Sequence, residues 1–335
     1  MYKIESNKQF NIIKVKTKEI EVEFLDYGAR IYSLKTKDYQ GTFGDIVLQY
    51  SDIEDYINDN ISLNATIGPI AGRVKNAKIE AGGRVYHLDK NSDNKHTLHG
   101  GSLALSSKFF DYEITEYDNC TEVMFLYEEE STVKYLARVF YQIYDNKINI
   151  NYEVESDQDF VFSLTNHAYF NLSGDLKRNV KNHIVYLKSN KRHEVDNDLI
   201  FTGNIIKEEG MYDFTKEKPV NDTINSLEST TKGGIDDTYY FPANDKRFTM
   251  AFVYEPISKR MMKIKSSYDH LVFYSHNNIN HLPLKHIEEH KKHYALCFEC
   301  EKGPYGFYDS QVKNNLLKKG KLYQESILFE FLIRD

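Results

Sequence analysis

One histidine stands in a setting that neither a protein core nor a solvent-exposed surface explains well. His167 lies in the run 162–174, where apolar residues alternate with Thr165, Asn166 and Asn171. An isolated core histidine is often satisfied by a neighbouring carbonyl, but burying several polar side chains together is costly. The cluster therefore favours a concave polar site at the end of a strand. Because the ordinary pKa of histidine is close to neutrality, we expect His167 to transfer protons there.

A second histidine, His99, precedes a glycine pair, Gly100-Gly101. Glycine lets the chain turn sharply and allows a ligand to approach the backbone closely. His-Gly-Gly is also found in ordinary turns, so His99 is a candidate because it can be paired with His167. Together the two histidines indicate proton transfer on a substrate rich in hydroxyl groups.

Glu299 lies late in an apolar, strand-like segment. Strand alternation places Leu296, Phe298 and Cys300 on one face, and Cys297 and Glu299 on the other. A carboxylate among apolar neighbours has a raised pKa and is a candidate general base, although a solvated outer face is an equal alternative. The same alternation argues against a metal or redox pair formed by Cys297 and Cys300, because their thiols point to opposite faces.

Two charged residues follow glycines and are candidates for holding a ligand. Arg73 ends the segment Gly68-Pro-Ile-Ala-Gly-Arg73, and its planar guanidinium could bind two hydroxyl groups at once. Asp236 follows Gly233-Gly-Ile and leads into a strand-like run. A surface arginine and an ordinary aspartate turn are the simpler alternatives.

The segment His286-Ile-Glu-Glu-His290 matches the H-x-x-E-H pattern of a class of zinc peptidases. Such a site needs helices and a further acidic ligand. Here Lys285, Lys291 and Lys292 make the segment a charged surface stretch. Short motifs often match by chance, so we expect no metal site and no cofactor.

Composition narrows the functional classes. The 335-residue chain is 41% hydrophobic, which is enough for a sizeable core, and its net charge of −7 argues against a nucleic-acid partner. No stretch approaches the ~20 apolar residues of a membrane span, and the first residues have no apolar signal region. With three cysteines in all, we expect a cytoplasmic protein without membrane association.

Hydrophobic periodicity is that of strands almost throughout. Alternating residues predict a hairpin over 139–154 with its turn at 145–146. Further strands are predicted at 20–24, 121–127, 183–188, 247–254, 271–275, 294–300 and 326–333. Short helices are predicted only at 51–58 and 283–293. With no linker or repeat, we predict one domain over residues 1–335, an all-β fold built as a large antiparallel β-sandwich with a few short helices.

The motifs, taken in order, resemble the aldose 1-epimerase (galactose mutarotase) family along nearly the whole chain. Its most specific signature is similar to Leu164-Thr-Asn-His-Ala-Tyr-Phe-Asn-Leu-Ser-Gly174. Other matching segments are Tyr27-Gly-Ala-Arg-Ile-Tyr-Ser-Leu34, Gly68-Pro-Ile-Ala-Gly-Arg73, Thr97-Leu-His-Gly-Gly101, Asp198-Leu-Ile-Phe-Thr-Gly203, Tyr212-Asp-Phe214, Gly234-Ile-Asp236 and Leu296-Cys-Phe-Glu299.

This resemblance implies a galactose-mutarotase type of sandwich that interconverts the α- and β-anomers of free aldohexoses. It implies that Glu299 takes the C1 hydroxyl proton, that His167 protonates the ring oxygen, and that His99 assists. The substrate-binding residues would be Arg73, Asp236 and His96. The only partner expected is a small-molecule sugar, bound by a monomer or homodimer.

Some positions depart from the family pattern. Gly72 and His96 stand where many members have Asn, and Val272 where Gln is frequent; Phe109-Phe110 lie near the place of a missing tryptophan. These changes leave the acid/base pair intact but leave the choice of sugar open. A hexose-phosphate epimerase and a non-catalytic sugar-binding protein of the same fold are the alternatives.

Overall fold

Strands dominate the fold, as the alternating sequence predicts. The structure is a computed structural model that describes residues 1–242, 249–288, 291–303 and 315–334. It contains one nine-stranded and two five-stranded antiparallel sheets. The prediction of an all-β antiparallel sandwich is therefore confirmed.

The nine-stranded sheet forms one layer of the sandwich, and the predicted hairpin over 139–154 is its β13–β14 pair. Burial alternates strictly along both strands, so one face of the sheet is apolar. In spatial order its strands are β11 (Asp111–Glu116), β12 (Thr121–Glu129), β13 (Tyr135–Ile143), β14 (Lys147–Ser156), β27 (Leu322–Ile333), β23 (Arg260–Ser266), β22 (Ala251–Tyr254), β17 (Ile184–Leu187) and β20 (Lys218–Pro219).

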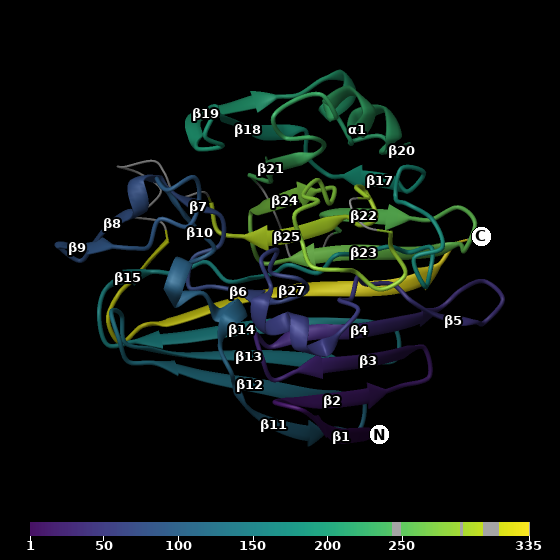
Figure 1. Cartoon of the computed structure of the whole chain (residues 1–335), viewed down its shortest axis with the longest axis horizontal. Helices are drawn as coiled ribbons and strands as arrows, with labels where there is room; N and C mark the ends of the chain where they lie inside the picture. The colour runs from purple at the N-terminus through teal and green to yellow at the C-terminus, as the bar shows by residue number, and fades with distance from the viewer. Residues whose placement is uncertain (243–248, 289–290, 304–314, 335) are drawn as a thin grey trace.

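A five-stranded sheet formed by the first part of the chain packs against this apolar face. Figure 1 shows β2–β4, drawn in purple, in front of β12–β14. Phe24 on β3 joins the two layers, because its ring lies 4.6 Å from that of Tyr141 and 6.1 Å from that of Phe125. The strands are β1 (Tyr2–Asn7), β2 (Phe10–Lys16), β3 (Ile20–Leu25), β4 (Arg30–Lys37) and β5 (Phe43–Asp45).

The second five-stranded sheet lies over the other half of the large sheet, where β21, β24 and β25 stand in front of β22 and β23 in Figure 1. Phe273 and Phe298 stack face to face on its inner side, with 5.1 Å between ring centroids. Both belong to the hydrophobic cluster that also contains Ile264 and Phe329 of the large sheet. In order, the strands are β19 (Phe201–Lys207), β18 (Lys191–Val195), β21 (Asp236–Tyr240), β24 (His270–Tyr274) and β25 (Cys297–Glu301).

Short two-stranded ladders carry the segments that cross between the sheets. They pair β6 (Thr66–Ile67) with β16 (Thr165–Asn166), β7 (Arg73–Val74) with β10 (Thr97–Leu98), β8 (Lys78–Ala81) with β9 (Arg84–His87), and β15 (Phe160–Val161) with β26 (Leu316–Leu317). β16 also lies against β25. This contact brings the segment before His167 to the strand that carries Glu299.

Helices are few and short. The predicted helix at 51–58 is a 3₁₀-helix, Ile53–Asn58, and further 3₁₀ turns span Lys75–Ala77, Gly101–Leu103, Leu105–Ser107 and Gly210–Tyr212. The sequence did not predict the α-helix α1 (Asn221–Leu227). The prediction of a helix over 283–293 is wrong for its described residues, which form turns and a bridge. Among the described residues, no helix is long and apolar enough to cross a membrane.

Candidate active site

Backbone hydrogen bonds on both sides fix the position of His167. Its N–H donates to the carbonyl of Ala65 at 3.0 Å, and its carbonyl accepts from the N–H of Asn64 at 3.2 Å. The Asn64 side chain adds a bond from the N–H of Tyr169 at 2.9 Å. The Tyr169 ring in turn stacks on the imidazole, with 4.9 Å between centroids. His167 is therefore held by a rigid frame rather than by a free loop.

The amide side chains around His167 have structural roles, which corrects the view that they line a site. Asn166 donates to the Tyr141 hydroxyl at 3.2 Å, and Asn171 donates to the carbonyl of Tyr294 at 2.8 Å. Both are buried and satisfied within the fold. Of these three polar residues, Thr165 alone has a buried side-chain polar atom, its hydroxyl, without a hydrogen-bond partner in the described parts of the chain.

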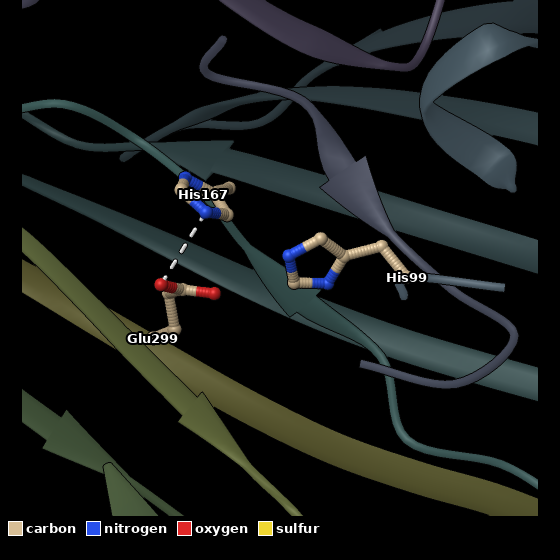
Figure 2. Close-up of side chains that lie close together, drawn as sticks. All are labelled: His99, His167 and Glu299. Atoms are coloured by element: carbon tan, nitrogen blue, oxygen red, sulfur yellow. Dashed lines mark ion pairs between the residues drawn. The ribbon is translucent and has the colours of Figure 1, made fainter. Parts of the chain in front are cut away.

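His167 and Glu299 face each other across the junction of β16 and β25. The Nε2 atom of His167 lies 3.5 Å from Oε1 of Glu299, and the two side chains are only 8% and 4% exposed. The His99 ring stands at 88° to that of His167, with 5.5 Å between centroids. One ligand atom from each of the three residues lies within 4.8 Å of the others. Figure 2 shows these side chains converging from three separate segments.

Strand alternation places Glu299 as the sequence predicts. Phe298 and Cys300 belong to the large hydrophobic cluster, whereas Cys297 belongs to a second cluster on the opposite face of β25. All three cysteines are free. Glu299 thus shares its face of the strand with Cys297.

A left-handed turn and two contacts with Gly72 orient His99. The residue has φ of +53°, and the following Gly100 has φ of +90°. The N–H of His99 donates to the carbonyl of Gly72 at 3.0 Å, and Nδ1 accepts from the N–H of Gly72 at 3.3 Å. Because a backbone N–H can only donate, the neutral ring carries its proton on Nε2. His99 therefore offers a hydrogen-bond donor to the group.

That tautomer argues against a resident metal ion, although two histidines and a carboxylate are a possible ligand set. A metal-binding histidine needs a lone pair on the coordinating nitrogen and normally donates its other N–H to an oxygen. At His99 the arrangement is the reverse, because Nδ1 accepts a hydrogen bond and Nε2 carries the proton. The three residues fit proton exchange better than metal binding.

Burial controls the protonation of the group. It raises the pKa of Glu299 well above its ordinary value, and the nearby Glu301 and Asp236 add to this effect, while Arg73 opposes it. Burial lowers the pKa of His167 to about 4 and places that of His99 well below its ordinary value. These two directions favour the neutral form of each member of the His167–Glu299 pair.

Arg73 and Asp236 both lie beside this group, as the sequence predicts. The charge of Arg73 acts on the pKa values of His99, Asp236 and Glu299. The guanidinium is half-buried, and its Nε has no hydrogen-bond partner in the described parts of the chain. Asp236 begins β21, and burial raises its pKa.

Sequence reasoning missed a further carboxyl, Glu301, two residues after Glu299 on the same face of β25. It is 3% exposed, and its Oε2 has no partner within residues 1–242, 249–288, 291–303 and 315–334. Burial, with a contribution from Asp236, raises its pKa to about 8. The alternation that placed Glu299 would also have found Glu301, but it belongs to none of the recognised motifs.

Two departures from the family pattern lie beside these carboxyls. Val272 is the direct cross-strand neighbour of Glu299 in the β24–β25 pair. A side chain added at Gly72 would begin 3.8 Å from Oε1 of Glu301. Both departures therefore lie next to carboxyls of the group.

The structure does not bring His96 to the group. Its Nδ1 accepts from the N–H of Asn76 at 2.9 Å, and its Nε2 lies 3.5 Å from Oδ2 of Asp198. The ring is 1% exposed. A contact between His96 and the substrate remains a prediction, and the observed bonds join two surface segments.

The segment at 286–290, which matches the H-x-x-E-H zinc-peptidase pattern, lies only partly within the described residues. His286 is in a turn with φ of +64°, while Glu289 and His290 fall outside the described ranges. His293 is turned into the protein, where its Nδ1 bonds the carbonyl of Ser275 at 2.9 Å. The described part of the segment has no helix on which such a zinc motif could form.

A wide groove of about 660 Å³ lies elsewhere, between β17 and the segment at 255–257. Its principal charges, Arg178 and Glu255, are paired with each other at 3.0 Å. Because these groups are already satisfied, the groove is a poorer candidate for chemistry than the group around Glu299.

The fold and site together define a β-sandwich protein with a buried acid/base pair. Comparison with known proteins agrees: residues 11–330 match the family model described as aldose 1-epimerase. Similar curated proteins include galactose mutarotase of Mus musculus, 27% identical with 96% of this chain and 93% of that protein covered, and aldose 1-epimerase of Streptococcus thermophilus, 26% identical with 98% and 96% covered. The chain therefore belongs to the aldose 1-epimerase family of isomerases.

Solved structures show the same fold. Galactose 1-epimerase from Lactobacillus acidophilus superposes with a TM-score of 0.86 at 20% identity, covering 100% of this chain and 99% of that one. The aldose epimerase homologue from C. elegans gives 0.85 at 22% identity, covering 97% and 100%.

Proposed function

We propose that this protein interconverts the α- and β-anomers of a free aldohexose of the galactose or glucose type. The observation that carries the proposal is the buried pair of His167 Nε2 and Glu299 Oε1, 3.5 Å apart. Each group has a pKa displaced toward its neutral form, so the two can exchange one proton at little cost in charge.

The reaction needs one proton removed and one donated across the sugar ring. Glu299 as carboxylate takes the proton of the C1 hydroxyl, while His167 as imidazolium gives a proton to the ring oxygen. The bond between C1 and the ring oxygen then breaks, leaving an open-chain aldehyde, a neutral carboxyl and a neutral imidazole. Rotation about the C1–C2 bond presents the other face of the aldehyde, and closure returns both protons.

The ligand-free charges correspond to the middle of this cycle. A neutral Glu299 and a neutral His167 carry the same total number of protons as carboxylate plus imidazolium. Moving one proton from Glu299 to His167 therefore prepares the pair for a closed ring. The Nε2 proton of His99, oriented by Gly72, would donate to a sugar oxygen, and Arg73 and Asp236 would hold the remaining hydroxyl groups.

The charges at the site favour a free sugar over a hexose phosphate. Three carboxyls, Asp236, Glu299 and Glu301, surround one guanidinium, that of Arg73. A phosphate dianion is bound best by clustered arginines or lysines, and one guanidinium among three carboxyls does not provide such a cluster. A hexose phosphate is therefore a less well supported substrate than a free hexose.

Polarimetry of freshly dissolved α-D-galactose and α-D-glucose tests the proposal. We expect the protein to speed the approach to the equilibrium rotation far beyond the spontaneous rate. If the purified protein gave only the spontaneous rate on a panel of aldoses, it would be a sugar-binding protein without this activity.

A further inference from the structure

Glu301 is a buried carboxyl for which the proposed reaction has no use. It lies on the same face of β25 as Glu299, beside the gap that Gly72 leaves by having no side chain. Its Oε2 is inaccessible to solvent and lacks a hydrogen-bond partner among the residues that the structure describes. A buried polar oxygen without a partner is costly, which indicates that a ligand supplies the missing donor.

The nearby cations are engaged with other groups. The ammonium of Lys232 bonds Oδ1 of Asp237 at 2.6 Å and the carbonyl of Asp236 at 2.9 Å. Lys302, next in sequence, forms an ion pair with Glu325. Arg73 acts on Glu299 and Asp236, and no ion pair within the described ranges joins it to Glu301. The site thus contains an excess of carboxyls over available cations.

We propose that Glu301 makes this site selective for amino-hexoses, by binding the protonated amine of the sugar with its carboxylate. The proposal rests on the proposed anomerase function, because it names a substrate class for the same site. An ammonium group donates charge-assisted hydrogen bonds, which are roughly twice as strong as those of a neutral hydroxyl. It would also balance the surplus of acidic groups.

Binding of such a sugar should release a proton. Near pH 7 the Glu301 carboxyl is mostly protonated, because burial raises its pKa to about 8. A neighbouring ammonium favours the carboxylate, so the proton leaves as the sugar binds. Four other titratable groups interact electrostatically with Glu301 or with its neighbour Glu299. They are Asp236 on β21, Glu299 itself on β25, Tyr323 on β27 and Arg73 on β7.

Calorimetry measures this binding without relying on catalysis. D-galactosamine and D-galactose would be titrated at pH 7 into the wild-type protein, Glu301→Gln and Glu113→Gln, the last a control on the exposed part of β11. Repeating each titration in buffers of different ionisation enthalpy gives the number of protons released. Thermal melting of each variant shows that the fold is retained.

We expect wild type and Glu113→Gln to bind D-galactosamine about tenfold or more tightly than D-galactose, with net proton release. Glu301→Gln should lose both the preference and the proton release while still binding D-galactose. Equal affinities in the wild type, or a preference unchanged in Glu301→Gln, would overturn the proposal.

Polarimetry on the same proteins separates this proposal from the proposed function. Acceleration with galactose but no preference for galactosamine would refute the role of Glu301 alone. Preferential binding of galactosamine with no acceleration of any aldose would refute the anomerase function and leave the Glu301 site standing.

Discussion

Two clusters in the described part of the chain have the same composition, two histidines and one carboxyl, yet they differ in how their polar atoms are paired and in how far the carboxyl is buried. The first, which we call the open cluster, consists of His99, His167 and Glu299. The second, which we call the closed cluster, consists of His193, His270 and Asp269.

In the closed cluster two contacts pair the carboxyl and the facing ring nitrogens, while Nδ1 of His193 has no partner among the described residues. Oδ1 of Asp269 lies 2.7 Å from Nδ1 of His270, and Nε2 of His270 lies 3.0 Å from Nε2 of His193. The Asp269 side chain is 53% exposed. Burial raises the pKa of Asp269, but the hydrogen bond with His270, the charge of that ring and smaller contributions together outweigh burial and lower the pKa. The result is an ordinary charged carboxylate that orients a ring.

In the open cluster the imidazole and the carboxyl lie too far apart for a normal hydrogen bond. The 3.5 Å between His167 and Glu299 exceeds the usual hydrogen-bond distance of about 2.7–3.2 Å. Their carboxyl is buried rather than exposed, and its pKa is raised rather than lowered. Residue composition alone therefore does not define an active site. An active site is better indicated by polar atoms that are buried and close together but do not form hydrogen bonds with one another.

Replacing the members of the pair should give the largest effect. Glu299→Gln and His167→Asn should each lower kcat/KM for anomer equilibration by about 10²–10⁴-fold, because each positioned acid or base contributes about that much. In the closed cluster, His270→Asn should change kcat/KM only a few-fold. An equal loss in His270→Asn, measured by polarimetry, would show that the distinction between the clusters is wrong.

The pH profile should report the same pair. Below the pKa of His167, about 4, both groups become protonated and neither can act as base, so kcat/KM should fall. On the alkaline side it should fall only as pH rises through the raised pKa of Glu299. Because Glu301 helps to raise that pKa, Glu301→Gln should shift the alkaline limb to lower pH, whereas Glu113→Gln should leave it in place.

His99→Asn should have an intermediate effect. It removes one hydrogen-bond donor and leaves both proton-transfer groups, so kcat/KM should fall by about tenfold. A loss of kcat/KM as large as that of His167→Asn would show that His99, rather than only donating a hydrogen bond, acts as a general acid.

The closed cluster should matter for stability instead. His270→Asn breaks one buried and one partly buried contact and should lower the free energy of unfolding by about 1–3 kcal/mol, as measured by urea denaturation. The variant His99→Asn, in a half-buried and less satisfied place, should unfold close to the wild type. The reverse order of stabilities would contradict this division of roles.

The smallest effect is expected from metal removal. Since the tautomer of His99 disfavours coordination, incubation with EDTA should leave the rate of anomer equilibration unchanged. Loss of activity that returned with added zinc would show that the open cluster holds a metal after all.

Much of this could be predicted from the sequence, because alternation in strands determines burial directly. It predicted the β13–β14 hairpin and the opposite directions of Cys297 and Cys300. The helix α1 was missed because seven residues give too little periodicity to detect. The contact between His193 on β18 and His270 on β24 joins residues 77 positions apart, on two strands with β21 between them, and no local pattern encodes it.

The roles of the amides were also beyond local reasoning. Asn166 and Asn171 draw attention to the correct segment, but their partners, such as Tyr141 and Tyr294, come from distant strands. The polar residues therefore pointed to the segment that carries His167, but the predicted reason, that the amides line a site, is wrong.

The strand β25 has a consequence for how the protein can be handled. Phe298 faces the core and Glu299 the open cluster, one residue apart. A slip of one position against β24 would turn the carboxyl into the hydrophobic layer and the phenyl ring out of it. The pairing register of one edge strand is thus part of the catalytic apparatus, and recovered activity after refolding should report strand alignment more sharply than recovered β-structure content.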